Sequence, residues 1–174
     1  LMVDHENDDF HFFFGTTHFD HGDHYHKESI FDSTNCAKMA PDLLDHTQPY
    51  HDTGLPVIYT GDFNSNYNSN AYDILTNASN SHNEGYVLKE TWDLAKKVVI
   101  TANTEPVPEY DHTTSIDHIF VSATDSVVVS EVSVDTYVYP YTTKDGKTHS
   151  TNPSDHKAIF TTLTSFGAAN SRRV

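Results

Sequence analysis

Four short segments of the sequence place carboxylate, amide and imidazole side chains beside apolar, strand-like runs. The segments are THFD at 17–20, GDFN at 61–64, SIDH at 115–118 and PSDH at 153–156. In sheet proteins with helical crossovers, ligands bind where strands end. Each segment alone is a weak signal, but their recurrence in this order predicts one shared site for acid–base or metal chemistry.

The first two segments supply an imidazole, a carboxylate and an amide. His18 is able to act as a general acid, a general base or a metal ligand, because histidine titrates near neutral pH. In extended chain, residues two apart point the same way, so Asp62 and Asn64 are predicted to face one pocket while Phe63 anchors the opposite side. A carboxylate holds Mg²⁺ or orients a water molecule, and a neutral amide steadies a phosphoryl oxygen without adding repulsive charge.

The other two segments supply a second combination of carboxylate and imidazole. Asp117 lies in an apolar strand, where a carboxylate is costly unless it is paired. A histidine is its natural partner, because an Asp–His pair orients and stabilises an imidazolium in serine hydrolases. His118 points away from Asp117 on a strand and is predicted to have a packing role. Asp155 offers a carboxylate for metal or water, and His156 offers an imidazole for proton transfer.

The composition is strongly acidic, with 25 Asp and Glu against 10 Lys and Arg, which gives a net charge of −15. Such a surface repels polyphosphate unless cations intervene, so it disfavours a nuclease that binds DNA over a large surface. The sequence has no apolar run long enough to cross a membrane and opens without a basic-then-apolar leader. It predicts a soluble chain and leaves the compartment, secretion included, open. Cys36 is the single cysteine and is predicted to be buried on a helix.

The alternation of apolar runs with helix-compatible spacing predicts strands joined by helices. A helix is expected from 27 to about 47, restarted or kinked at Pro41, with shorter helices at 71–75 and around Trp92. This order predicts an α/β or α+β fold, in which a mixed β-sheet layer carries helices on one face. The expected strands lie at 10–17, 55–59, 115–122, 126–134 and 157–163.

Taken together, the four segments resemble the endonuclease/exonuclease/phosphatase superfamily, the deoxyribonuclease-I-like metal-dependent phosphoesterases. The resemblance implies a two-sheet sandwich with helices outside, of which this chain supplies the second sheet and part of the first. It implies that His156 is the general base or the phosphate-contacting histidine, oriented by Asp117. It also implies that Asp62 positions the nucleophilic water or a metal, and that Asn64 stabilises the phosphoryl transition state.

Two further residues complete the implied site. His18 corresponds to the second histidine of the deoxyribonuclease and sphingomyelinase branches, and Asp155 is implied as a metal-side carboxylate, with Asp62 as the other metal ligand. The implied cofactor is Mg²⁺ or Mn²⁺. The implied reaction is water attack on the phosphorus of a phosphate ester, which is a nucleic acid, a phospholipid or a small phosphoester. Phosphodiester hydrolysis is favoured, and the loops at 105–112 and 137–151 are expected to contact the substrate.

One part of the family pattern has no counterpart in this sequence. Nothing before His18 matches the family's first-strand Asn or its metal-binding Glu, and Glu6 lacks the apolar strand that should precede it. We therefore expect residues 1–174 to form one partial domain of a longer fold, with an acidic leader at 1–9 and a tail at 165–174. The amino-terminal half of the fold is then an expected partner.

An alternative function stays open, namely a catalytically silent relative that binds metal. The missing Glu favours it, and so does a histidine-rich segment that follows the first strand. That segment is otherwise a solvated polar loop. Binding of Zn²⁺ without Mg²⁺-dependent hydrolysis distinguishes this alternative, and its candidate ligands are His18, His21, His24 and His26.

Overall fold

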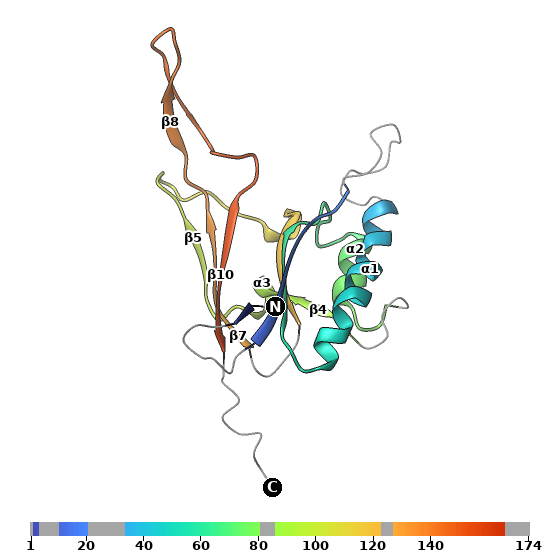
Figure 1. Ribbon diagram of the computed structural model, residues 1–174. Coiled ribbons are helices and arrows are strands. Elements are labelled where there is room, and N and C mark those ends of the chain that lie inside the picture. The colour runs from blue at the N-terminus through green and yellow to red at the C-terminus, as the bar shows by residue number, and fades with distance from the viewer. Residues whose placement is uncertain (1, 4–10, 21–33, 81–85, 123–126, 166–174) are drawn as a thin grey trace.

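The computed structural model describes residues 2–3, 11–20, 34–80, 86–122 and 127–165. Its architecture has three layers, in which two β-sheets pack face to face and two helices cover the outer face of one sheet (Figure 1). The four polar segments of the sequence fall in the two sheets and the connections next to them.

The central sheet has five strands in the order β1-β2-β3-β6-β4. Strand β3 runs parallel to β2 and antiparallel to β6, so the sheet is mixed. The aromatic and β-branched residues of these segments favour strands, because their side chains pack well on a pleated surface. The strands are β1 (Met2–Val3), β2 (His11–His18), β3 (Val57–Asp62), β6 (Asp117–Ser122) and β4 (Leu88–Glu90).

Gly61 lets the ends of β2 and β3 approach each other. Its φ is 147°, and a Cβ atom added there would lie 1.8 Å from the carbonyl oxygen of Thr17. A residue without a side chain is therefore required at this point. As a result, the two strands stay paired as far as His18 and Asp62.

The helices α1 (Thr34–Asp52) and α2 (Asn70–Thr76) cover one face of the central sheet. Ser69 caps α2, since its side chain accepts a hydrogen bond of 3.1 Å from the backbone N–H of Tyr72. The residues of α1 that face the sheet are spaced three or four apart, as expected for one side of a helix. Its buried residues are Cys36, Ala40, Leu43, Leu44 and Thr47.

A second sheet of three strands, in the order β10-β7-β5, packs against the opposite face of the central sheet. Ile58 and Val121 of the central sheet form one buried cluster with Val129 and Val132 of β7. The strands of this sheet are β5 (Val98–Thr101), β7 (Val127–Asp135) and β10 (Ala158–Ser165).

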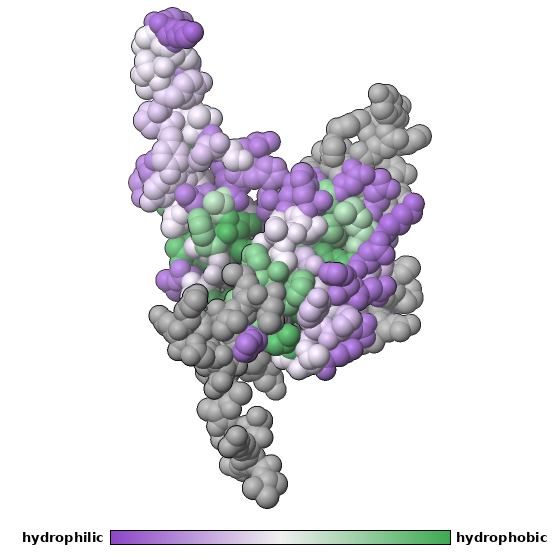
Figure 2. Space-filling view, in the orientation of Figure 1, coloured by the Kyte–Doolittle hydropathy of each residue, from purple (hydrophilic) through white to green (hydrophobic). Residues whose placement is uncertain are grey.

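A hairpin of β8 (Tyr139–Thr142) and β9 (Thr148–Thr151) projects from the body of the molecule (Figure 1). Figure 2 shows hydrophilic residues over this hairpin and hydrophobic residues gathered on the body. Two short helical segments, α3 (Thr91–Leu94) and η1 (His112–Thr114), connect the strands.

The predicted fold class is confirmed, because the chain forms a mixed sheet with helices on one face. Within the described residues each predicted strand and helix is present, with ends that differ by a few residues. Positions 27–33 of the first predicted helix lie outside the described residues. Cys36 is fully buried on α1, as predicted. Within the segment expected to be an acidic leader, Met2–Val3 form β1 at the edge of the central sheet, and residues 1 and 4–9 lie outside the described residues. None of the described helices is long and apolar enough to cross a membrane.

Two local features differ from the predictions. The helix is not restarted at Pro41, the first of the two predicted alternatives, but runs on to Asp52, because burial of its apolar face against the sheet outweighs the lost hydrogen bond. The other alternative, a kink at Pro41, stays a prediction. The segment 137–151 is a hairpin rather than a loop. Its turn contains Asp145 followed by Gly146, whose φ is 80°, and this pair is a recognised hairpin signal.

Candidate active site

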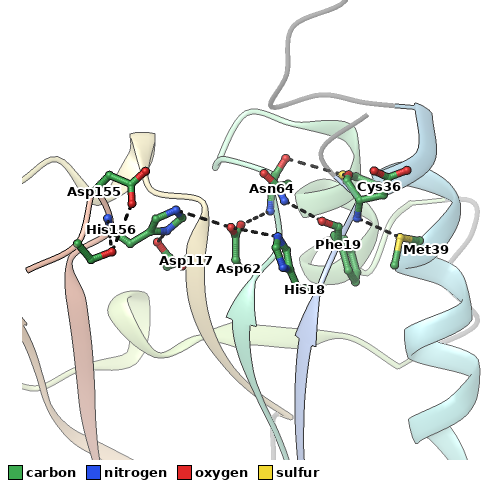
Figure 3. A network of polar contacts seen from close by, with 11 residues as sticks. His18, Phe19, Cys36, Met39, Asp62, Asn64, Asp117, Asp155 and His156 are labelled. Carbon is green, nitrogen blue, oxygen red and sulfur yellow. Dashed lines mark hydrogen bonds and ion pairs between the residues drawn. The ribbon is translucent and has the colours of Figure 1, made fainter. Parts of the chain in front are cut away.

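Three of the candidate side chains lie in one row across β2, β3 and β6. In the strand register His18 is opposite Asp62, and Asp62 is opposite Asp117. Residues that lie opposite each other on neighbouring strands project from the same face of the sheet. The register therefore brings an imidazole and two carboxylates together at one edge (Figure 3).

Asp62 lies at the centre of this row. Its Oδ2 atom is 3.5 Å from Nε2 of His18 and 3.9 Å from Nε2 of His156. The two imidazoles approach the carboxylate from opposite sides (Figure 3). The Asp62 side chain is 19% exposed and that of His18 is 72% exposed, so the row borders solvent and is open to a ligand.

His156 reaches the row from the connection that precedes β10. Its Nδ1 atom lies 2.6 Å from Oδ2 of Asp117. Because an ionised carboxylate only accepts hydrogen bonds, Nδ1 is the donor and Nε2 faces Asp62. This hydrogen bond is the main cause that raises the pKa of His156 above its ordinary value. The charges of Asp117, Asp62 and Asp155 add to the rise, and burial opposes it.

Asn64 lies beside Asp62 for a reason that the sequence did not indicate. The chain turns after β3, and Asn64 has a φ of 45°, so the two residues are not neighbours on an extended strand as predicted. The backbone N–H of Asn64 donates to Oδ1 of Asp62 at 2.8 Å, and its side-chain amide donates to the carbonyl of Phe19 at 2.7 Å. Phe63 is fully buried, as expected for an anchor. The Asn64 amide therefore holds the turn in place.

Asp155 lies on the far side of His156 from Asp62 (Figure 3). Its side chain is exposed, and its Oδ1 atom accepts a hydrogen bond from Ser154 at 3.4 Å. The structure therefore does not bring together the two metal ligands that were predicted, Asp62 and Asp155. It groups Asp62 instead with Asp117 and His156, whose ligand atoms all lie within 4.8 Å of one another.

The donor set of this group fits a hard divalent cation. Mg²⁺ is usually held through one or two carboxylates, with water molecules completing its shell. Asp62 and Asp117 supply such carboxylates, and the described residues add no thiolate that would select a softer metal. The predicted zinc cluster at His21, His24 and His26 lies outside the described residues.

A cavity of about 410 Å³ borders Asp117 and His156, and this volume lies within the range of small-molecule sites. The ring of Tyr110 packs against Trp92, with 5.5 Å between their centroids, which stiffens one wall. Lys157 also lines the cavity. The sequence did not indicate this residue, because it lies just outside the polar segment 153–156 and belongs to no motif. The loop 105–112, predicted to contact the substrate, contributes Glu109, Tyr110 and Asp111 to the lining.

The family model described as "Endonuclease/Exonuclease/phosphatase family" matches residues 11–156. The chain belongs to this family. The match runs from the first residue of β2 to His156, so it includes all four polar segments, and the predicted resemblance is confirmed. A comparison with curated proteins gives no significant match.

Two solved structures from Bacteroides thetaiotaomicron share the endonuclease/exonuclease/phosphatase fold with this chain. A mannosyl-6-phosphatase superposes with a TM-score of 0.65 at 24% identity, and the match covers 89% of this chain and 52% of that one. A second member of the family gives a TM-score of 0.58 at 23% identity, covering 85% and 48%. The chain therefore spans about half the length of these relatives.

Proposed function

We propose that this protein hydrolyses phosphate esters in a reaction that depends on a divalent metal, by attack of water on phosphorus. The observation that carries the proposal is the cluster at the strand ends. In it, Asp62 lies between the Nε2 atoms of His18 and His156, while Asp117 holds the other ring nitrogen of His156. Membership of the endonuclease/exonuclease/phosphatase family supports the same chemistry.

In this proposal His156 transfers the proton. Because Nδ1 donates to Asp117, Nε2 is the nitrogen able to accept a proton from water or to contact the phosphate. Asp117 fixes the orientation of the ring and stabilises the imidazolium that forms. His18, which is exposed at the other end of the row, is placed to donate a hydrogen bond to a phosphoryl or leaving-group oxygen.

Asp62 orients the attacking water or binds the cation, because its Oδ2 atom faces the open side between the two imidazoles. When bound, Mg²⁺ or Mn²⁺ neutralises charge on the phosphoryl oxygens and lowers the pKa of a bound water molecule. Asp62 and Asp117 are the carboxylates placed to hold it, and Asp155 contributes negative charge from the far side of His156. Asn64 supports this arrangement through the hydrogen bond that it donates to Asp62.

The lining of the cavity favours a second candidate beside the predicted phosphodiester. Carboxylates of Glu109, Asp111 and Asp155 line it, and Lys157 is the opposing cation. Because like charges repel, a nucleic acid or polyphosphate fits poorly beside these groups. A small phosphate monoester with an uncharged alcohol fits better. The solved relative that is a mannosyl-6-phosphatase makes a sugar phosphate the first monoester to test.

The experiment is an assay of hydrolysis with Mg²⁺, Mn²⁺ or EDTA, with Asp62→Ala as the control variant. The substrates are p-nitrophenyl phosphate, bis-p-nitrophenyl phosphate, plasmid DNA and a hexose 6-phosphate. Metal-dependent turnover that Asp62→Ala abolishes supports the proposal, and the preferred substrate separates monoesterase from diesterase. Folded protein that turns over none of them, yet binds Zn²⁺, supports the silent metal-binding relative instead.

A further inference from the structure

One residue of the turn that follows β3 has a backbone conformation that residues other than glycine rarely adopt. Asn64, with its φ of 45°, lies between Asp62 and Ser65. Asparagine tolerates this left-handed region better than most residues, but such conformations persist where the surrounding structure holds them on several sides. The orientation of the Asp62 carboxylate depends on this turn, because Asn64 N–H holds one of its oxygens at 2.8 Å.

A buried histidine holds the far side of the same turn. Nε2 of His118 lies 2.7 Å from the carbonyl oxygen of Ser65, and Nδ1 lies 2.8 Å from Oε1 of Glu90. The hydroxyl of Tyr72 donates to the other carboxylate oxygen of Glu90 at 2.8 Å. The His118 side chain has no exposed surface and that of Glu90 is 6% exposed, so the network is closed to solvent.

The bonding partners fix the role of the ring nitrogen that meets the turn. A carbonyl oxygen only accepts hydrogen bonds, so Nε2 of His118 carries a hydrogen and donates it to Ser65. The ring packs against Phe63 and Phe120, with centroid distances of 5.9 and 5.2 Å. Rotation of the ring would leave buried polar atoms of Ser65 and Glu90 without partners, which is unfavourable. His118 is therefore held in one orientation.

We propose that His118 is a positioning residue for the active site. Glu90 and Tyr72 hold its ring, the ring holds the Ser65 carbonyl, and the carbonyl fixes the turn that aims Asp62. Asp117 and His118 are neighbours in β6, so one strand presents a side chain to the site on one face and supports the site from the other face. The effect on turnover rests on the proposed function, whereas the effect on the turn does not.

The test compares His118→Asn with His118→Gln. The amide nitrogen of Asn replaces Nδ1 and keeps the contact with Glu90, whereas that of Gln replaces Nε2 and keeps the contact with Ser65. Each variant loses one buried hydrogen bond, and His118→Gln loses the one to the Glu90 carboxylate. A purely structural role therefore makes His118→Gln at least as damaging as His118→Asn. We expect His118→Asn to lower kcat about 100-fold with KM unchanged, as for a misplacement of about 1 Å. We expect His118→Gln to stay within a few-fold of the parent protein.

A second readout does not depend on activity. The backbone amide resonance of Asn64, which reports on its bond to Asp62, is expected to move in His118→Asn and to stay close to its original position in His118→Gln. Both variants lose the same ring, so its shielding effect is common to them. Parent protein that shows no turnover contradicts the proposed function, and the Asn64 resonance then decides the inference by itself.

Equal kcat values and equal Asn64 shifts in the two variants would overturn the inference. Circular dichroism tests whether both variants fold. If either does not, Tyr72→Phe takes its place, because it removes the outermost hydrogen bond of the network, the one to Glu90, and keeps the aromatic ring. A few-fold fall in kcat with unchanged KM then supports the inference, and an unchanged kcat contradicts it.

Discussion

Two of the histidine–carboxylate pairs in the described part of the chain each take one member from β6, and they differ in their surroundings. His156 and Asp117 are 2.6 Å apart at the edge of the sheet, with 38% and 27% of their side chains exposed. His118 and Glu90 are 2.8 Å apart beneath the helices, with 0% and 6% exposed. The adjacent residues Asp117 and His118 thus belong to opposite faces of β6.

The second ring nitrogen distinguishes the two pairs. In His156 it faces Asp62 and the open side of the site, so it is able to exchange a proton with a ligand. In His118 it donates to the Ser65 carbonyl, so neither nitrogen has a free side. The exposed pair is therefore suited to chemistry and the buried pair to positioning. This comparison predicts that the two pairs respond differently to substitution.

The largest expected effect is on turnover at the exposed side. Asp62→Ala or His156→Ala is expected to lower kcat by about 10²–10⁴-fold, because in the proposed mechanism each removes a group that positions water or transfers a proton. Thermal unfolding of these variants should change little, since both side chains border solvent. The matched control is His11→Ala, an exposed histidine at the opposite end of β2 from His18, for which kcat should equal that of the parent protein. Comparable losses in the control would contradict the assigned site.

A large effect on stability is expected at the buried pair. Glu90→Ala leaves a buried imidazole without its partner, and breaking such a pair costs about 3–5 kcal/mol. Glu90→Gln should cost much less, because an amide is able to accept from Tyr72 and to keep a hydrogen bond with Nδ1 of His118. Urea unfolding of both variants measures the difference in the free energy of unfolding. Equal losses would show that the hydrogen bonds of this network do not support the fold.

The exposed pair should contribute far less to stability. Asp117→Asn keeps the shape of the side chain and is expected to change the free energy of unfolding by no more than about 1 kcal/mol, the usual range for partly exposed ion pairs. The same variant should nevertheless lower kcat, because the imidazolium of His156 loses its stabilising charge. A stability loss as large as that of Glu90→Ala would remove the distinction between the two pairs.

The smallest expected effect is a shift in a titration curve. The pKa of His156 is raised in the folded chain, chiefly by its hydrogen bond to Asp117. The folded protein therefore binds this proton more tightly, and the resulting stability is present below the ordinary pKa of 6.5 and is lost as pH rises through the raised value. Histidine NMR of metal-free protein should show the raised midpoint, and Asp117→Asn should lower it. An unchanged midpoint in the variant would contradict the assigned cause.

Much of the fold could be predicted from the sequence, because its strongest signals are local. Aromatic and β-branched runs indicate strands, and the polar segments at their ends indicate which residues meet. The register then places His18, Asp62 and Asp117 in one row. The opposite orientations of Asp117 and His118 follow from the alternation of a strand in the same way.

Other features could not be predicted, because they depend on contacts between distant parts of the chain. Glu90 is 28 positions from His118 in the sequence, and neither its own segment nor that of Tyr72 carries a recognisable motif. The turn at Asn64 could not be predicted either, because the in-and-out alternation of side chains on a strand does not continue past Asp62. Packing between the helices and the sheet, rather than local preference, determines these positions.

The central claim is that Asp62 and His156 act as one catalytic unit. The most direct test measures kcat for Asp62→Ala, for His156→Ala and for the double variant, in the presence of Mg²⁺. Residues that act as a unit are strongly non-additive, so the double variant is predicted to be about as active as the weaker single variant. Losses that multiply, with the double variant lower by the product of the two single effects, would show that the residues act independently and would contradict the assigned site.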